Sequence, residues 1–158
     1  MSMLATRTAQ AALVARIRRV LSKETDPETA DRVLAEAIRE DARAAGAAFA
    51  GLAPGGPSLE HFATVLDRWR EGDALTIEGV TMTADSLSFA VTRCAYALAY
   101  ADQGLDPGLG AILSCSRDEP FATGYSPRLS MERSETIMEG APRCLFTFTW
   151  RHEPWPST

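Results

Sequence analysis

Three neighbouring side chains could do chemistry together: Cys115, Asp118 and Glu119. On a helix, positions i, i+3 and i+4 share one face, so this spacing brings a thiol and two carboxyls to a common point. The thiol becomes a nucleophile or a metal ligand once a cation or a metal ion stabilises its thiolate. Neighbouring carboxylates repel each other, which raises the pKa of one and suits it to act as a general acid. Alternatively, Cys115 only continues a buried stripe from Ile112, and both carboxyls are solvated.

The cation that such a thiol requires has to come from an arginine elsewhere in the chain. Arg117 lies close in sequence, but two positions correspond to about 200° around a helix, so Arg117 would face the opposite side. Arg93 and Arg133 are the better candidates. In an alternating strand, Arg133 and Glu135 share the face of apolar Met131, where a guanidinium is costly unless it meets an anion. Arg133 therefore either pairs with an internal carboxylate or binds the carboxylate of a small acidic ligand.

The chain has three cysteines, Cys94, Cys115 and Cys144, and no two of them are close in sequence. There is no C-x-x-C pair, so the pattern does not indicate a zinc ribbon or a thioredoxin-like site. Free cysteines are most often small buried hydrophobic residues. In a second interpretation, the three thiols and Asp118 converge on a divalent ion such as zinc in tetrahedral geometry. The sequence therefore predicts either no cofactor or one divalent metal ion.

Several classes of protein are excluded by what the sequence lacks. It has no Gly-rich phosphate loop, no H-E-x-x-H zinc helix and no G-x-S-x-G elbow. Both histidines, His61 and His152, fit solvated positions, so the sequence gives little support for a Ser-His-Asp triad or a Cys-His dyad. A net charge of −5 argues against a nucleic-acid partner. No apolar run approaches the ~20 residues of a membrane span, and no secretory signal is readable, so we expect a cytoplasmic protein.

The elements that position these groups follow from changes of periodicity along the chain. Apolar spacings of three and four predict a helix around residues 13–23 and further helices over 27–50 and 59–70, so residues 1–72 are mainly helical. Residues 73–151 are expected to run hairpin, helix, helix, hairpin, with a tail at 152–158. The second of these helices starts at Asp106 and carries Cys115, with a kink at Pro120. In the last hairpin, one strand runs from 129 to about Met138.

This order predicts an α+β fold in a single domain over residues 1–158. Its N-terminal helices are followed by an antiparallel sheet of about four strands, built from two hairpins and covered by helices on one face. The first helix carries a narrow apolar stripe that includes Leu13, Ile17 and Val20. We expect this stripe to pack against a second copy of the chain and to form a homodimer with two-fold symmetry.

Four short motifs lie in the second half of the chain in a fixed order: R-C-x-Y at 93–96, C-x-x-D at 115–118, E-R-x-x-T at 132–136 and G-x-x-x-C-x-F at 140–146. In this respect the chain resembles the L-2-amino-thiazoline-4-carboxylic acid hydrolase family over about half its length. Ala141 and Pro142 depart from the family pattern, because an acidic residue is frequent there. The closing strand pair is also similar to the end of 4-vinyl-reductase-type domains, which are small α+β ligand-binding modules.

The family resemblance implies a hydrolase that opens the ring of a small cysteine-derived thiazoline carboxylic acid at a C–N or C–S bond. We expect Asp118 to act as acid or base, and Cys115, with Cys94, to act as nucleophile or metal ligand. Arg93 or Arg133, with Glu135, would bind the substrate. Alternatives from other classes are a non-enzymatic ligand-binding or sensor module of the same fold, and an interaction module that dimerises through its first helix. The proposed ligands of a divalent ion are Cys94, Cys115 and Cys144.

Overall fold

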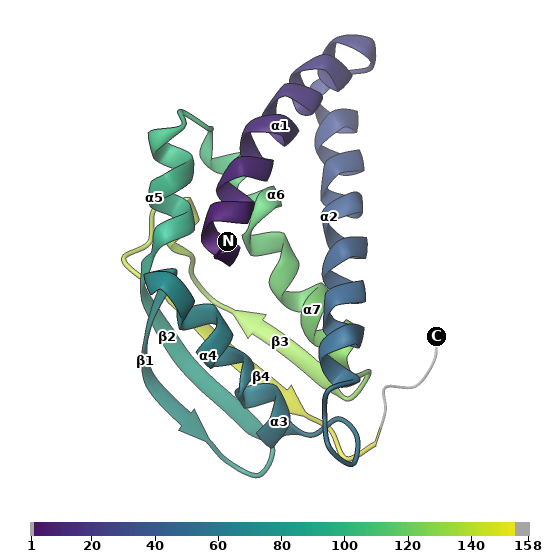
Figure 1. Cartoon of the computed structure of the whole chain (residues 1–158), viewed down its shortest axis with the longest axis vertical. Coiled ribbons are helices and arrows are strands. Elements are labelled where there is room, and N and C mark those ends of the chain that lie inside the picture. The colour runs from purple at the N-terminus through teal and green to yellow at the C-terminus, as the bar shows by residue number, and fades with distance from the viewer. Residues whose placement is uncertain (1, 154–158) are drawn as a thin grey trace.

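The structure is a computed structural model that describes residues 2–153, and it confirms the predicted α+β fold (Figure 1). The helical part begins with two long helices, α1 and α2, and ends with two short ones, α3 and α4. The elements are α1 (Met3–Glu24), α2 (Pro27–Ala50), α3 (Leu59–Ala63), α4 (Val65–Arg70), β1 (Leu75–Met82), β2 (Ser86–Cys94), α5 (Ala95–Asp102), α6 (Pro107–Leu113), α7 (Asp118–Tyr125), β3 (Leu129–Arg133) and β4 (Cys144–Trp150). Short 3-10 turns lie at Glu71–Asp73, Cys115–Arg117 and Ile137–Glu139.

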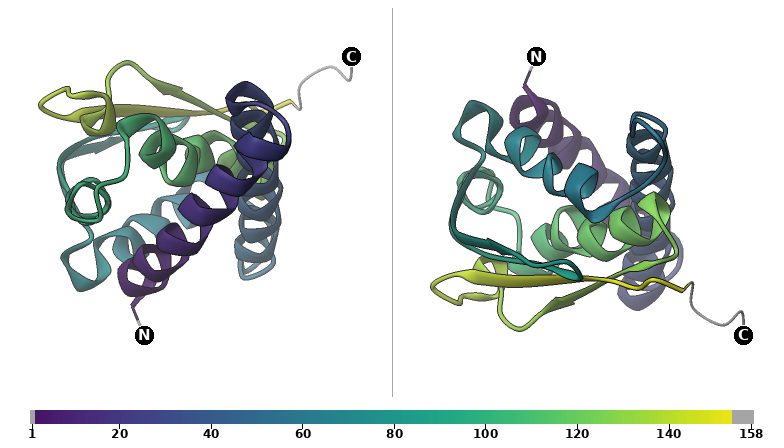
Figure 2. Two further views of the ribbon diagram at one scale, coloured as in Figure 1. Left: turned by 90° about the horizontal axis from the view of Figure 1, so that it is seen from above. Right: turned by 90° about the horizontal axis from the view of Figure 1, so that it is seen from below.

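The four strands form one antiparallel sheet in the order β1-β2-β4-β3. The last strand of the chain therefore lies inside the sheet, between the first hairpin and β3. Figure 2 shows that the helices gather on one face of this sheet. Gly79 has a positive φ of 62° and sits where the register between β1 and β2 shifts, as expected for a bulge. Because only one face is covered, the buried residues alternate along β2 and β4.

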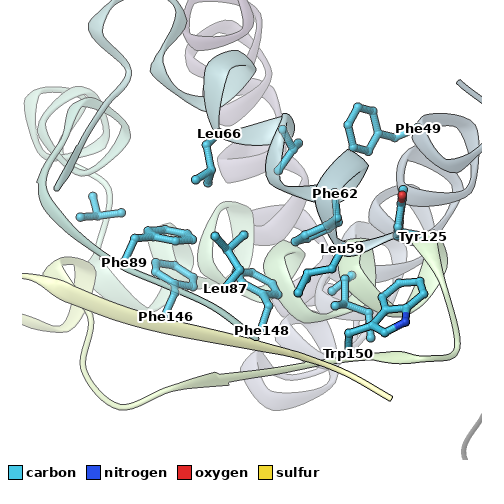
Figure 3. Close-up of a cluster of buried hydrophobic side chains, with 14 of the residues drawn as sticks. Phe49, Leu59, Phe62, Leu66, Leu87, Phe89, Tyr125, Phe146, Phe148 and Trp150 are labelled. Atoms are coloured by element: carbon cyan, nitrogen blue, oxygen red, sulfur yellow. The ribbon is translucent and has the colours of Figure 1, made fainter. Parts of the chain in front are cut away.

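The core is an aromatic cluster on the covered face of the sheet (Figure 3). Phe89 of β2 lies opposite Phe146 of β4, and their rings stack with centroids 5.1 Å apart. Phe148 extends this stack along β4, and Phe62 of α3 packs on it from the helical layer at 4.9 Å. Offset and tilted ring pairs of this kind add to the free energy gained by burying the rings. The cluster fixes β2 and β4 against the short helices above them.

Helix starts follow the polar residues that precede them. Asp26, Ser58 and Asp106 each accept a hydrogen bond from a backbone N–H in the first turn of α2, α3 and α6. The helix predicted over 59–70 is interrupted at Thr64, so it forms α3 and α4 instead of one element. The predicted tail at 152–158 is described only for its first two residues, and the rest lies outside the described residues. Among residues 2–153, no helix is long and apolar enough to cross a membrane.

The predicted helix through Cys115 is wrong in one respect that matters for the site. Helix α6 ends at Leu113, Cys115 lies in a 3-10 turn, and α7 begins at Asp118. In an uninterrupted helix, Pro120 would leave the carbonyl of Ser116 without a donor. Restarting the helix at Asp118 moves Pro120 into a first turn, where the N–H groups have no intrahelical partner anyway.

The strand predicted to run to Met138 is also shorter than expected. Strand β3 ends at Arg133, and Thr136 then caps a 3-10 turn by accepting a hydrogen bond from the Glu139 N–H at 3.2 Å. Gly140 follows with a φ of 94°, a conformation that favours glycine. The alternating pattern therefore does not extend to Glu135.

Helices α2 and α7 touch backbone to backbone at two glycines. A Cβ on Gly46 would collide with the backbone carbonyl of Phe121 and lie 2.8 Å from the amide nitrogen of Tyr125. A Cβ on Gly124 would lie 2.7 Å from the Cα of Arg43. No side-chain layer separates the two helices at these positions, so α7 is held directly against α2.

We predict that Gly46→Ala lowers the free energy of unfolding by about 2 kcal/mol or more, because backbone atoms cannot move aside as a flexible side chain can. Urea denaturation measures this loss. The matched control is Gly51→Ala at the end of α2, where the new Cβ would come no closer than 3.4 Å to its neighbours. There the change should stay within about 0.5 kcal/mol. Equal stability of both variants would contradict the close contact.

The apolar stripe on α1 is exposed, with Leu13 at 61%, Ile17 at 45% and Val20 at 55% of their full accessibility. The homodimer therefore stays a prediction that this surface permits. Sedimentation at micromolar concentration should give a dimer, and Ile17→Glu should give a monomer because it places a charge in the interface. Val80→Glu is the matched control, since Val80 is equally exposed on β1, away from α1. A monomeric wild-type chain would contradict the prediction.

Candidate functional site

A cavity of about 490 Å³ lies between the sheet and the helical layer. Its walls come from both halves of the chain, including α1, α2, α4, the turn before α7 and all four strands. Much of the wall is apolar, and the aromatic part consists of Phe49, Trp69, Phe121 and Phe146. The polar part consists of Arg7, Arg68, Cys94, Tyr96, Ser114, Cys115, Arg117, Asp118, Arg133 and Cys144.

The polar end of the cavity is organised by an ion pair between Asp118 and Arg133. The Arg133 Nη1 atom lies 2.5 Å from Asp118 Oδ2 and also donates a hydrogen bond to the Cys115 carbonyl at 3.0 Å. Both side chains are largely buried, at 24% and 17% exposure, and the guanidinium lies over the Phe146 ring. Of the two alternatives for Arg133, the structure has the internal ion pair. The same guanidinium therefore links the 3-10 turn before α7 to the last residue of β3.

Burial raises the pKa of Asp118 to about 6, although Arg133 and Arg117 both act to lower it. A carboxyl of this kind changes its protonation state close to neutral pH, as a general acid or base must. The raised pKa also links the site to stability. The unfolded chain releases this proton at lower pH, so the stabilising contribution is complete below about pH 4 and is lost as pH rises through about 6.

All three cysteines line this cavity together with Asp118. Burial raises the pKa of each thiol, and the pKa of Cys115 rises to about 12 through burial and the Asp118 charge. The Cys144 sulfur also accepts a hydrogen bond from the Ile137 N–H at 3.2 Å. These thiols are therefore neutral at pH 7 in the protein as described. Residues 2–153 hold no group of three or more His, Cys, Asp or Glu side chains arranged to bind a metal ion.

Three residues predicted near the site lie outside it. Arg93 is exposed and donates a hydrogen bond to the Asp73 carbonyl at 2.9 Å. Glu135 pairs with Arg143 at 3.0 Å, because β3 ends before the alternating pattern reaches it. Glu119 is exposed, so it does not form a buried carboxyl pair with its neighbour. None of the three contributes to the cavity wall.

The predicted solvated position is wrong for His61. Its ring is half-buried, stacks on Phe49 with centroids 4.7 Å apart, and its Nδ1 lies 3.0 Å from the Tyr125 hydroxyl. That hydroxyl also donates to the Ser58 carbonyl and accepts from the Ser58 N–H, which ties α3 to α7. His152 is exposed as expected and pairs with Asp85 at 2.7 Å.

Three residues that line the cavity were not among the predicted site residues: Arg7, Arg117, and Tyr96, which the sequence showed only as part of the R-C-x-Y motif. Arg117 had been assigned to the opposite side of a continuous helix, but the break before α7 turns it toward the same space. Its side chain is 12% exposed, and its guanidinium forms an ion pair with Asp41 of α2. Arg7 lies in a helix whose sequence gave no sign of a site, because α1 reads as an ordinary amphipathic helix.

The sequence matches the protein-family model described as L-2-amino-thiazoline-4-carboxylic acid hydrolase over residues 6–148. The matched range contains Arg7, Asp118 and Arg133, together with β1, β2, β3 and most of β4. A comparison with functionally curated proteins finds no match.

We predict that Arg133→Met raises the pKa of Asp118 above about 6, because burial then acts on the carboxyl without its neighbouring cation. Carboxyl ¹³C NMR of the folded protein across pH 4–9 would follow the titration. Arg93→Met is the matched control, since it removes an exposed arginine outside the cavity and should leave the titration unchanged. An unchanged or lower pKa in Arg133→Met would contradict the role of the ion pair.

Proposed function

The chain belongs to the L-2-amino-thiazoline-4-carboxylic acid hydrolase family, and on that premise we propose that it hydrolyses the ring of a small thiazoline carboxylic acid. The observation that carries this proposal is Asp118, a carboxyl with a pKa of about 6 at the wall of a largely apolar cavity. Its ion pair with Arg133 fixes its position. Such a group exchanges protons with a bound water or a leaving heteroatom near neutral pH.

The proposed reaction needs water, one proton carrier and a positioned ring. The Asp118 carboxylate accepts a proton from water while the water oxygen bonds to the amidine-like ring carbon, which becomes tetrahedral. The bond from that carbon to a ring nitrogen or sulfur then breaks, and the leaving atom takes the proton from Asp118. The net change is the addition of one water, and the carboxylate is regenerated. Arg133 holds Asp118 in place throughout and contributes as a positioning residue.

Cys115 is the less suitable nucleophile in this cavity. A thiol attacks as its thiolate, and burial together with the Asp118 charge raises the Cys115 pKa to about 12. Cys94 and Cys144 share the effect of burial. In our proposal the three thiols form part of the wall, and water activated by Asp118 replaces Cys115 and Cys94 as the attacking group.

A non-enzymatic ligand-binding module of the same fold is the second candidate. It is favoured by the aromatic part of the wall, where Phe49, Trp69, Phe121 and Phe146 offer extensive apolar surface to a bound molecule. Apolar pockets with a few convergent polar groups serve binding proteins as well as enzymes. Turnover separates the two candidates, because a binding module retains its ligand unchanged.

The purified protein should turn over L-2-amino-thiazoline-4-carboxylate, with kcat/KM rising as pH increases through about 6, where Asp118 becomes a carboxylate. Asp118→Asn should lower the rate roughly 10²- to 10⁴-fold, the usual effect of removing a proton-transfer group. Glu119→Gln is the matched control, because it removes the exposed neighbouring carboxyl. Equal effects of both substitutions would contradict the assignment, and no wild-type turnover with or without added divalent metal would favour the binding module.

Cys115→Ser distinguishes water from thiol attack. We expect the variant to keep its rate within roughly tenfold of wild type, because a neutral buried thiol supplies no nucleophile. The rate is measured on the same substrate, beside a thermal melt that controls for folding. A loss as large as that of Asp118→Asn, in a variant that remains folded, would restore the thiol to the mechanism.

A further inference from the structure

Two cations in the cavity wall have no carboxylate partner within residues 2–153, Arg7 and Arg68, but Arg68 is exposed and lies over the Phe49 ring, so Arg7 is the half-buried one. Four arginines line the cavity, and Asp118 is the only carboxylate in the same wall among the described residues. Arg133 is paired with Asp118, and Arg117 is paired with Asp41. Arg7 makes no hydrogen bond or ion pair with any part of the chain that the structure describes. It is half-buried, and burial and the nearby Arg117 charge lower its pKa more than the Asp41 charge, which is already paired with Arg117, raises it.

A hydroxyl beside this cation is also without a partner. Tyr96 lies in the first turn of α5 with a side chain that is 9% exposed, and it lines the same cavity. Its hydroxyl makes no hydrogen bond within residues 2–153. Every inaccessible side-chain N or O atom in that range has a hydrogen-bond partner, so this unpaired hydroxyl is accessible to solvent. Tyr96 and Arg7 are close enough for each charge to affect the other's pKa.

The elements that carry the two groups are joined. The Gln103 side chain after α5 donates a hydrogen bond to the Thr8 carbonyl of α1 at 2.9 Å. Figure 1 shows the N-terminal half of α1 beside the helical segment that follows β2. Arg7 and Tyr96 are therefore held on neighbouring elements, and they offer a guanidinium and a hydroxyl donor to the same space.

An unpaired guanidinium in a half-buried position is unfavourable unless an anion is supplied. We infer that Arg7 and Tyr96 form a carboxylate-binding subsite in the cavity, so that the ligand is an organic acid held between α1 and α5 with its body toward Asp118. The statement that this acid is also the substrate of a reaction rests on the proposed function. The half-buried charges favour a monoanion, since Arg117 is paired with Asp41, Arg68 is exposed to solvent, and Arg7 leaves one half-buried positive charge. A guanidinium and a hydroxyl suit the two oxygens of a carboxylate.

Binding of unreactive probes tests the subsite without turnover. L-Thiazolidine-4-carboxylate and phenylacetate each carry a carboxylate, and their amides serve as neutral partners. By titration calorimetry, wild-type protein should prefer each acid over its amide by roughly tenfold or more, as expected for a charge-assisted hydrogen bond. Arg7→Gln should abolish the preference, and Tyr96→Phe should reduce it. Arg16→Gln, on the exposed side of the same helix, should keep it.

A second readout separates ligand binding from a structural role. Removing an unpaired half-buried cation should raise the Tm of the ligand-free protein, so Arg7→Gln is expected to melt above wild type. A clear fall in Tm would assign Arg7 a structural role and overturn the inference. It would also be overturned if wild-type protein showed no preference for the acids, or if Arg7→Gln retained that preference.

The two proposals fail in different ways. A protein that selects acids through Arg7 but leaves L-2-amino-thiazoline-4-carboxylate unchanged refutes the hydrolase and keeps the subsite. A protein that turns this substrate over with the same KM in wild type and Arg7→Gln refutes the subsite and keeps the hydrolase. An increase in KM of roughly tenfold or more, with kcat little changed, supports the subsite, because binding is then lost without loss of the proton carrier.

Discussion

The Asp118–Arg133 ion pair joins the first turn of α7 to the last residue of β3, and the local fold is arranged around it. For the carboxylate to lie there, α6 has to end at Leu113 and a new helix has to begin five residues later, at Asp118. The Arg133 guanidinium also donates a hydrogen bond to the Cys115 carbonyl, in the turn between the two helices. Arg133 thus contacts both the turn that interrupts the helix and the carboxylate of Asp118. The interruption of the helix and the position of Asp118 therefore depend on the same side chain.

The cavity balances stability against binding. Its aromatic walls contribute to the core, as Phe146 does by stacking on Phe89 while facing the open space. Its polar groups work in the opposite direction, because a carboxyl with a raised pKa and an unpaired guanidinium both lower the stability of the empty protein. Unfavourable groups of this kind persist where a ligand offsets them. Asp118 and Arg7 therefore both indicate that this cavity binds a ligand, because each is unfavourable in the empty protein.

The sequence predicted the sheet and most helix starts because those depend on local signals. Period-two patterning gave the hairpin of β1 and β2, and the capping residues gave the starts of α2 and α6. The break at Ser114 was missed because Pro120 suggests only that a helix is disturbed, without saying where it restarts. Asp118 and Arg133 were found from residue type and spacing. Arg7 was not, since only the three-dimensional fold brings α1 to a cavity formed a hundred residues later.

The glycine contact between α2 and α7 determines which wall of the cavity can move. Backbone packed on backbone at Gly46 and Gly124 leaves no side chains to change rotamer, so the wall with Asp118 and Phe121 is fixed relative to α2. Helix α1 is held differently, through longer side chains such as Arg18, which bridges Asp31 and Asp106. Adjustment to ligands of different size therefore falls to α1, and the wall that carries Asp118 keeps its geometry when α1 shifts.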